Sequence, residues 1–218
     1  MDQTFPLRRR EIVETEPLVK TLKERWPALF SERQVYAKFN RIATTNLEND
    51  FFDALDCFTP RFVHIFKSKK GSVEEKLAEI VQQVDSGKSD VTAVHSLFLR
   101  GLPILLGDDP SNFYNTAFDS NDNEGWAQVT VGLLTVISED APVFSSHLHL
   151  NLLSTAIILE GGIVMDNLTS LPQAFCLLFG LSYAHHLEYP RAMRNTLNFI
   201  QRVMLRLGEN KLPQDSKL

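Results

Sequence analysis

Apolar residues in the first half of the chain recur every three to four positions, which is the period of an α-helix. The stretch "SERQVYAKFNRIA" shows the pattern most clearly. It begins with Ser31 and Gln34, which have the spacing of a capping box at the start of a helix. The same period runs through "ETEPLVKTLKERW", "LENDFFDALDCF" and "SVEEKLAEIVQQV". Thr59 and Pro60 resemble the cap and first residue of a separate short helix. These segments predict a helical region over residues 11–85.

The pattern changes after the polar stretch "DSGKSD" at residues 85–90, which is the best candidate linker. A helix is expected to resume after Ser89 and to end at Gly101. The segment "DDPSNFYNTAF" suits a short helix begun by Asp109 and Pro110. In contrast, "QVTVGLLTVIS" is rich in β-branched residues and predicts a strand.

Two adjacent glycines stand between apolar runs in "IILEGGIVMD". A phosphate-binding loop would need a helix to begin directly after them. Instead, the β-rich runs on both sides of Gly161 and Gly162 indicate a hairpin over residues 154–166 with a tight turn, where glycine permits positive φ.

The last part of the chain predicts two helices. "LPQAFCLLFGLSYAHHL" is apolar nearly all round and should be buried, whereas "PRAMRNTLNFIQRVMLRLG" has one apolar stripe and runs from Pro190 to Gly208. The expected fold is therefore α+β and mainly helical, with a small antiparallel sheet packed against the two C-terminal helices. The α+β region spans residues 89–210 and either stands alone or forms one compact unit with 11–85. Flexible tails are expected at 1–10, which is basic, and at 211–218.

Composition narrows the classes of function. The chain has 218 residues, of which 44% are hydrophobic, and a formal net charge of -5, which argues against a chain-wide electrostatic surface for nucleic acid or anionic membranes. No apolar run is long enough to span a bilayer, and the N-terminus lacks the apolar core of a signal peptide. We expect a soluble intracellular protein, in the cytoplasm or alternatively the nucleus, with Cys57 and Cys176 as reduced thiols.

Motifs that resemble chemical sites are incomplete. Ser182 in "GLSYA" lies in a helical pattern rather than after a strand, as a nucleophile elbow requires. The calcium-like loop from Asp119 has Glu124 and Thr130 where glycine and a bidentate glutamate belong. We therefore expect no catalytic residue and no cofactor.

Histidines offer the one conceivable metal site. His147 and His149 would share a face of a strand, and His185 and His186 follow the buried helix. Zinc would require at least three of them to converge, and no recognised ligand spacing is present. The sequence therefore predicts no metal.

Basic residues cluster at Arg8, Arg9 and Arg10, and again at Lys67, Lys69 and Lys70. The arginines are a candidate nucleic-acid contact, although a solvated tail explains them more simply. The lysines fit the last turn of a helix, where cations are favourable.

Several stretches together resemble a family of fish proteins labelled sterile alpha motif domain-containing protein 3-like. They are "RRREIVETEPLVKTLKERWPALF", "LRGLPILL", "VTVGLLTVISED" and the long segment from "IILEGGIVMD" to "LRLGENKL". The resemblance covers about Leu7 to Leu212 and corresponds to the family's C-terminal region, without the sterile alpha motif itself. It implies no catalytic residues.

The sequence thus favours a non-enzymatic protein-interaction module, with a nucleic-acid-associated regulatory protein as the alternative. The segment "STAIILE" carries no charge before Glu160, so it lacks the usual guard of an edge strand. If it lies at the edge of the sheet, a partner or a second copy of the chain could pair with Thr155, Ile157, Ile158 and Leu159. The alternative is a central strand that is paired on both sides.

Overall fold

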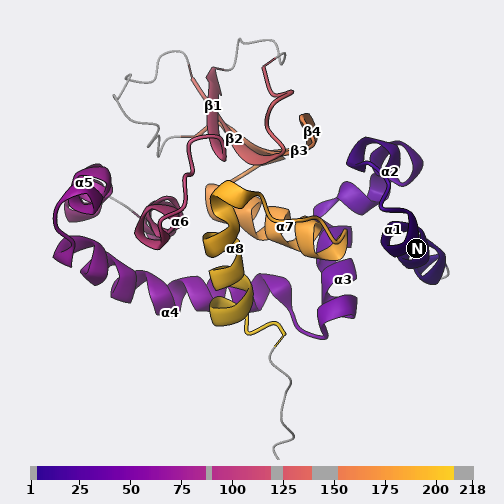
Figure 1. Ribbon diagram of the computed structural model, residues 1–218, viewed down its shortest axis with the longest axis horizontal. Helices are drawn as coiled ribbons and strands as arrows, with labels where there is room; N and C mark the ends of the chain where they lie inside the picture. Colours follow the sequence, from indigo (N-terminus) through magenta and orange to yellow (C-terminus); the bar gives the residue numbers. More distant parts are fainter. Residues whose placement is uncertain (1–3, 87–89, 119–124, 139–151, 209–218) are drawn as a thin grey trace, which may run out of the picture.

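A layer of helices supports a four-stranded sheet on one side (Figure 1). The computed structural model describes residues 4–86, 90–118, 125–138 and 152–208. The long helix α4 (Leu47–Ser68) crosses the base of this layer, opposite the sheet.

From Phe5 onward the chain forms a helix rather than the flexible tail expected for residues 1–10, of which 1–3 lie outside the described residues. Helix α1 (Phe5–Thr15) buries Arg8 and Ile12, which explains why it docks instead of remaining solvated. Helix α2 (Val19–Arg25) and a 3₁₀ turn, η1 (Pro27–Phe30), lead into α3 (Glu32–Ala43). The expected capping box at Ser31 is absent, because its hydroxyl donates to the carbonyl of Ala28.

Helix α4 continues through Pro60, so the separate helix predicted there is wrong. Proline removes one backbone donor. However, the helix buries aromatic residues on both sides of this position, including Phe51, Phe62 and Phe66, and their packing holds the two halves together.

Two further helices complete this side of the molecule. They are α5 (Ser72–Asp85) and α6 (Val91–Leu106), and α6 extends beyond the end expected at Gly101. Gly101 lets α6 approach α4 closely, since a Cβ there would lie 2.6 Å from the ring of Phe66. Of the expected linker, Asp85 ends α5 and Asp90 caps α6, while residues 87–89 lie outside the described residues.

The sheet is mixed rather than wholly antiparallel. Its strands lie in the order β1 (Tyr114–Phe118), β2 (Val131–Ile137), β3 (Ser154–Leu159) and β4 (Gly162–Leu168). The β2–β3 and β3–β4 pairs are antiparallel, but β1 runs parallel to β2.

The short helix expected in "DDPSNFYNTAF" is therefore wrong. After Pro110 the chain makes a single turn, closed by the amide of Phe113 donating to the carbonyl of Pro110, and then enters β1. Pairing with β2 determines this conformation.

The hairpin predicted at 154–166 is present as β3 and β4. Its turn residues are Glu160 and Gly161, with φ of 51° and 77°, as a primed turn requires. Gly162 is the first residue of β4 instead of part of the turn.

Helix α7 (Leu171–Ala184) is the buried helix that the sequence predicts. It packs against β2, β3 and β4 on one side and against α3, α4 and α6 on the other. The last helix is broken into a 3₁₀ turn η2 (Arg191–Met193), α8 (Arg194–Phe199) and a π-helical segment η3 (Ile200–Met204). Its expected apolar stripe is buried, mainly against α6 and α4.

The main core contains buried residues from Ile12 to Leu207, so both regions of the chain contribute to it. A smaller cluster lies on the outer face of the sheet and consists of Val129, Leu134, Ala156 and Ile158. The tail predicted at 211–218 lies outside the described residues.

Candidate functional site

Strand β3 lies inside the sheet, between β2 and β4. The edge position considered for Thr155, Ile157, Ile158 and Leu159 is therefore wrong. These residues carry no charge because the strand is buried, and all four have less than a tenth of their surface exposed.

The two edges of the sheet are β1 and β4, and α2 covers part of β4. Lys23 donates from Nζ to the carbonyl of Ile163 at 2.9 Å, and the amide of Val19 donates to Glu160 at 2.8 Å. A lysine beside an edge strand is a common guard against pairing with another chain.

Strand β1 presents the less protected edge. Its sequence, YNTAF, contains no charge and no proline. The amide of Leu133 donates to the carbonyl of Phe113, and in a parallel pair alternate residues point their backbone groups toward the neighbour. The backbone N–H and C=O of Asn115 and Ala117 therefore point toward β2, whereas those of Thr116 point away from it.

Helix α6 holds this edge strand in place. The hydroxyl of Tyr114 donates to the carbonyl of Leu99 at 2.7 Å. The guanidinium of Arg100 lies 4.8 Å from the centre of the Tyr114 ring, and its Nη2 donates to Thr135 at 3.4 Å. Because Tyr114 and Arg100 are buried, these contacts hold β1 in its extended conformation.

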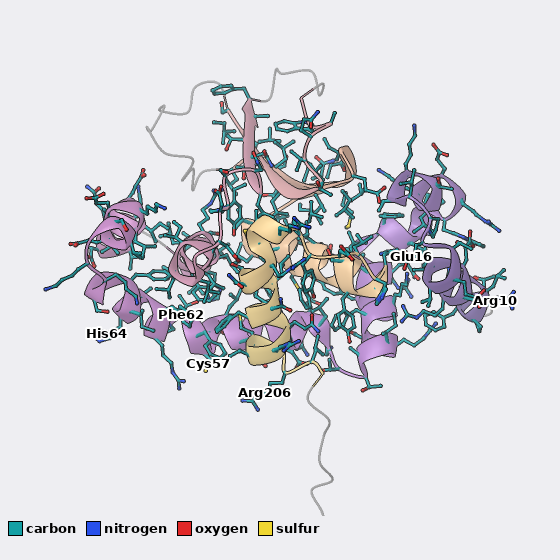
Figure 2. The ribbon with its side chains drawn as sticks, viewed as in Figure 1. Arg10, Glu16, Cys57, Phe62, His64 and Arg206 are labelled. Carbon is teal, nitrogen blue, oxygen red and sulfur yellow. The ribbon has the colours of Figure 1, made fainter. Side chains whose placement is uncertain are left out.

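The three N-terminal arginines do not form one surface. Arg8 is buried with its guanidinium 5.6 Å from the centre of the Trp26 ring, and Arg9 donates to the carbonyl of Ala184. Arg10 is exposed beside Glu14 and points away from the molecule in Figure 2. A nucleic-acid contact through this triplet stays a prediction that has one exposed arginine to support it.

A buried basic cluster lies where α1, α3 and the end of α7 meet, and the sequence analysis did not find it. It consists of Arg8, Arg9, Lys38 and His185. Burial, together with the nearby charges of Arg9 and Arg8, lowers the pKa of Lys38 to about 7. Lys38 follows Val35 by three residues and adjoins Phe39, so its place on the apolar face of α3 was the available signal.

His185 contributes a neutral imidazole to this cluster. Its ring stacks on Phe30 at 5.4 Å, and its Nδ1 lies 2.9 Å from the carbonyl of Leu181. A carbonyl oxygen only accepts, so Nδ1 carries the proton and Nε2 has a free lone pair. Burial lowers the pKa of His185 to about 3, with a further contribution from Lys38.

The remaining candidate residues do not converge. His185 is buried whereas the adjacent His186 is exposed, and His147 and His149 lie outside the described residues. In the described ranges, no three His, Cys, Asp or Glu side chains gather closely enough to hold a metal. Ser182 is buried inside α7, and most of the calcium-like loop, residues 119–124, is not described.

The cysteines and the second basic cluster are also separate features. Cys57 is exposed on α4, where Figure 2 shows it at the surface, and Cys176 is buried in α7. Burial raises the pKa of the Cys176 thiol. Lys67 forms an ion pair with Asp85 across the α4–α5 corner, while Lys69 and Lys70 are exposed after α4 ends.

Comparisons with known proteins give one partial match. The family described as "Sterile alpha motif domain-containing protein 3, helical domain" matches residues 1–31, which include α1, α2 and η1. This match supports a relationship to sterile alpha motif domain-containing protein 3 over that segment. No curated protein and no solved structure matches the chain. Among the helices of the described ranges, none is long and apolar enough to cross a membrane.

Proposed function

We propose that this chain is a non-enzymatic protein-interaction module that pairs with an extended strand along the free edge of β1. The outward N–H and C=O of Thr116, which no described residue pairs, carry the proposal, because an edge strand with unpaired backbone groups is a template for β-strand addition. Lys23 guards β4, whereas β1 carries no charge or proline in its own sequence, which makes β1 the favoured edge among the described residues.

A second copy of the chain is the partner that this edge fits. Two identical edges related by a two-fold axis pair antiparallel, and YNTAF would place no like charges opposite each other. With the axis at Thr116, the side chain of Phe118, which is 37% exposed, would face Tyr114 of the other copy. Aromatic pairs across strands add to the stability of such an interface.

Size-exclusion chromatography with light scattering tests this proposal over a range of concentrations. We expect a concentration-dependent dimer, and a monomer with unchanged circular dichroism for Thr116→Pro, because an edge strand tolerates the loss of an outward donor. Phe118→Ser should weaken the dimer, whereas Val91→Ser, which removes a side chain that is 67% exposed on α6, should not. A wild-type chain that stays monomeric, or a Thr116→Pro variant that still dimerises, contradicts the proposal.

The sequence resemblance supports two finer proposals. One is that the relationship to the sterile alpha motif domain-containing protein 3-like family of fish extends beyond residue 31 to about Leu212. The other is that the chain corresponds to the family's C-terminal region without the sterile alpha motif. An intracellular location, cytoplasmic or nuclear, is part of the same proposal and can be tested by microscopy of a tagged chain.

A further inference from the structure

The C-terminal helical segment has a charge opposite to that of the whole chain. From Pro190 to Gly208 it contains four arginines and no aspartate, glutamate or lysine, in a chain whose formal net charge is -5. All four arginine side chains are exposed, and within the described ranges none of them forms an ion pair. They are Arg191, Arg194, Arg202 and Arg206.

These arginines lie along the solvent side of the segment. Its apolar residues are buried, mainly against α6 and α4. Arg191, Arg194 and Arg202 recur at intervals near whole helical turns, so they share the opposite face. Arg206 follows η3 and points away from the molecule in Figure 2. Figure 1 shows the segment (gold) across the front of the helical layer, so the four side chains form one exposed row, here called the arginine row.

Helix electrostatics explains only part of this row. Cations are favourable at the C-terminal end of a helix, where Arg202 lies, and unfavourable at the N-terminal end, where Arg191 and Arg194 lie. The carboxylate of Asp108 accepts from amides at the start of α8 rather than from either arginine. Arg206 has a φ of 52°, a conformation in which glycine or asparagine is the usual residue. Contacts within the described residues therefore account for Arg202 alone.

We propose that the arginine row binds the phosphate backbone of double-stranded nucleic acid, without regard to its sequence. The planar guanidinium group of arginine can donate two parallel hydrogen bonds to one phosphate, which makes it well suited to this ligand. The row from Arg191 to Arg206 extends for about 20 Å at about 1.5 Å per helical residue, so it can contact several phosphates of one duplex.

The side chains around the row favour a duplex over other anionic partners. A protein interface needs an apolar centre, and binding to an anionic membrane is strengthened by inserted apolar side chains. This segment exposes one large hydrophobic side chain, Val203, and its single aromatic residue, Phe199, packs against Phe58 and Phe62. Single strands bind by stacking their bases on exposed aromatic rings. Backbone contacts along a duplex need only cations, which is what the row provides.

Fluorescence anisotropy with a short labelled DNA duplex tests the proposal on the full chain. We expect the logarithm of the binding constant to fall with the logarithm of salt concentration with a slope of about -3.6, because each of the four neutralised phosphates contributes about -0.9. Replacing all four arginines with glutamine should abolish binding and leave circular dichroism unchanged, since the side chains are exposed. The control replaces the same number of exposed cations elsewhere with glutamine and should keep the wild-type slope. Its positions are Arg10, Lys20, Lys69 and Lys70.

A single substitution keeps the test independent of how the fourfold variant folds. Arg202→Gln should make the slope shallower by about 0.9 and weaken binding to unrelated duplexes equally. Undetectable duplex binding or an unchanged slope for Arg202→Gln would overturn the proposal. So would a control variant that loses as much binding as the fourfold variant, because the charge of the whole chain would then be responsible.

Vesicles containing phosphatidylserine distinguish a nucleic acid from a membrane surface. We expect the chain to bind them more weakly than the duplex, because the row has little apolar surface to insert. Tighter binding to the vesicles would overturn the proposal and assign the row to a membrane. Self-association is measured separately by light scattering, and neither result depends on the other because the row includes no residue of β1.

Discussion

The two glycines of the β3–β4 hairpin differ in how much room they have. Gly161 has a φ of 77°, and a Cβ there would lie 3.0 Å from the backbone of Ala127, whereas a Cβ on Gly162 would meet nothing closer than 3.8 Å. Gly161→Ala should lower the free energy of unfolding by about 2 kcal/mol, from the positive φ and the contact together. Urea denaturation measures this, with Gly162→Ala as the control that should change little. Equal effects would contradict the turn geometry.

Lys38 should make the stability of the chain depend on pH. Its pKa falls from 10.5 to about 7 on folding, so between these values the unfolded chain binds more protons than the folded one. Stability therefore rises as pH increases from 7 to about 10. Lys38→Met should be more stable than wild type by about 1–3 kcal/mol at pH 7. Thermal melts should show this gain shrinking toward pH 10, and a constant difference would refute the explanation.

At the scale of elements, a distant carboxylate caps α8. Asp108 accepts from the amides of Asn195 and Thr196 at 3.3 and 2.7 Å, and from the Thr196 hydroxyl at 2.8 Å. Asp108→Ala should cost about 1–2 kcal/mol of stability, because it leaves helix N-terminal donors unpaired. Asp108→Asn retains an acceptor and should cost less. Denaturation of both variants tests the cap, which would be refuted if alanine and asparagine behaved alike.

Local patterns predicted most helices and the hairpin, and the failures have a common cause. Thr59 and Pro60 carry a real helix-start signal. The packing of Phe62 and Phe66 against α6 outweighs that signal, so α4 continues through Pro60. Strand β1 has only weak alternation, and its conformation depends on pairing with β2, a contact between distant residues. Tertiary contacts of this kind override local propensity.

The candidate sites were harder to predict for the same reason. Whether "STAIILE" lies at an edge or inside the sheet depends on strand order, which the local sequence does not encode. Similarly, three adjacent arginines on a helix point in different directions, so Arg8 is buried while Arg10 is exposed. For the buried basic cluster, the one signal in the sequence was the position of Lys38 on the apolar face of a predicted helix.

For the whole molecule, α7 joins the helical layer to the sheet. Leu178 is fully buried in a core that includes residues from both halves of the chain. Leu178→Asp should therefore unfold both halves, because it buries an unpaired charge in their common core. Circular dichroism should show loss of most helical signal, whereas Leu18→Asp, at a position that is 65% exposed, should melt like wild type. A Leu178→Asp variant that keeps wild-type melting would contradict this placement of α7.

The position of α2 against β4 decides what kind of assembly the sheet can build. A polypeptide beginning at Glu32 would lose the bonds from Lys23 to Ile163 and from Val19 to Glu160, and no described residue would then cover either edge of the sheet. With one open edge, pairing stops at a closed dimer; with two, each added copy offers a new edge and growth need not stop. We expect such a fragment to form fibres visible by electron microscopy, so the segment that matches a helical domain would act here as a terminator of polymerisation.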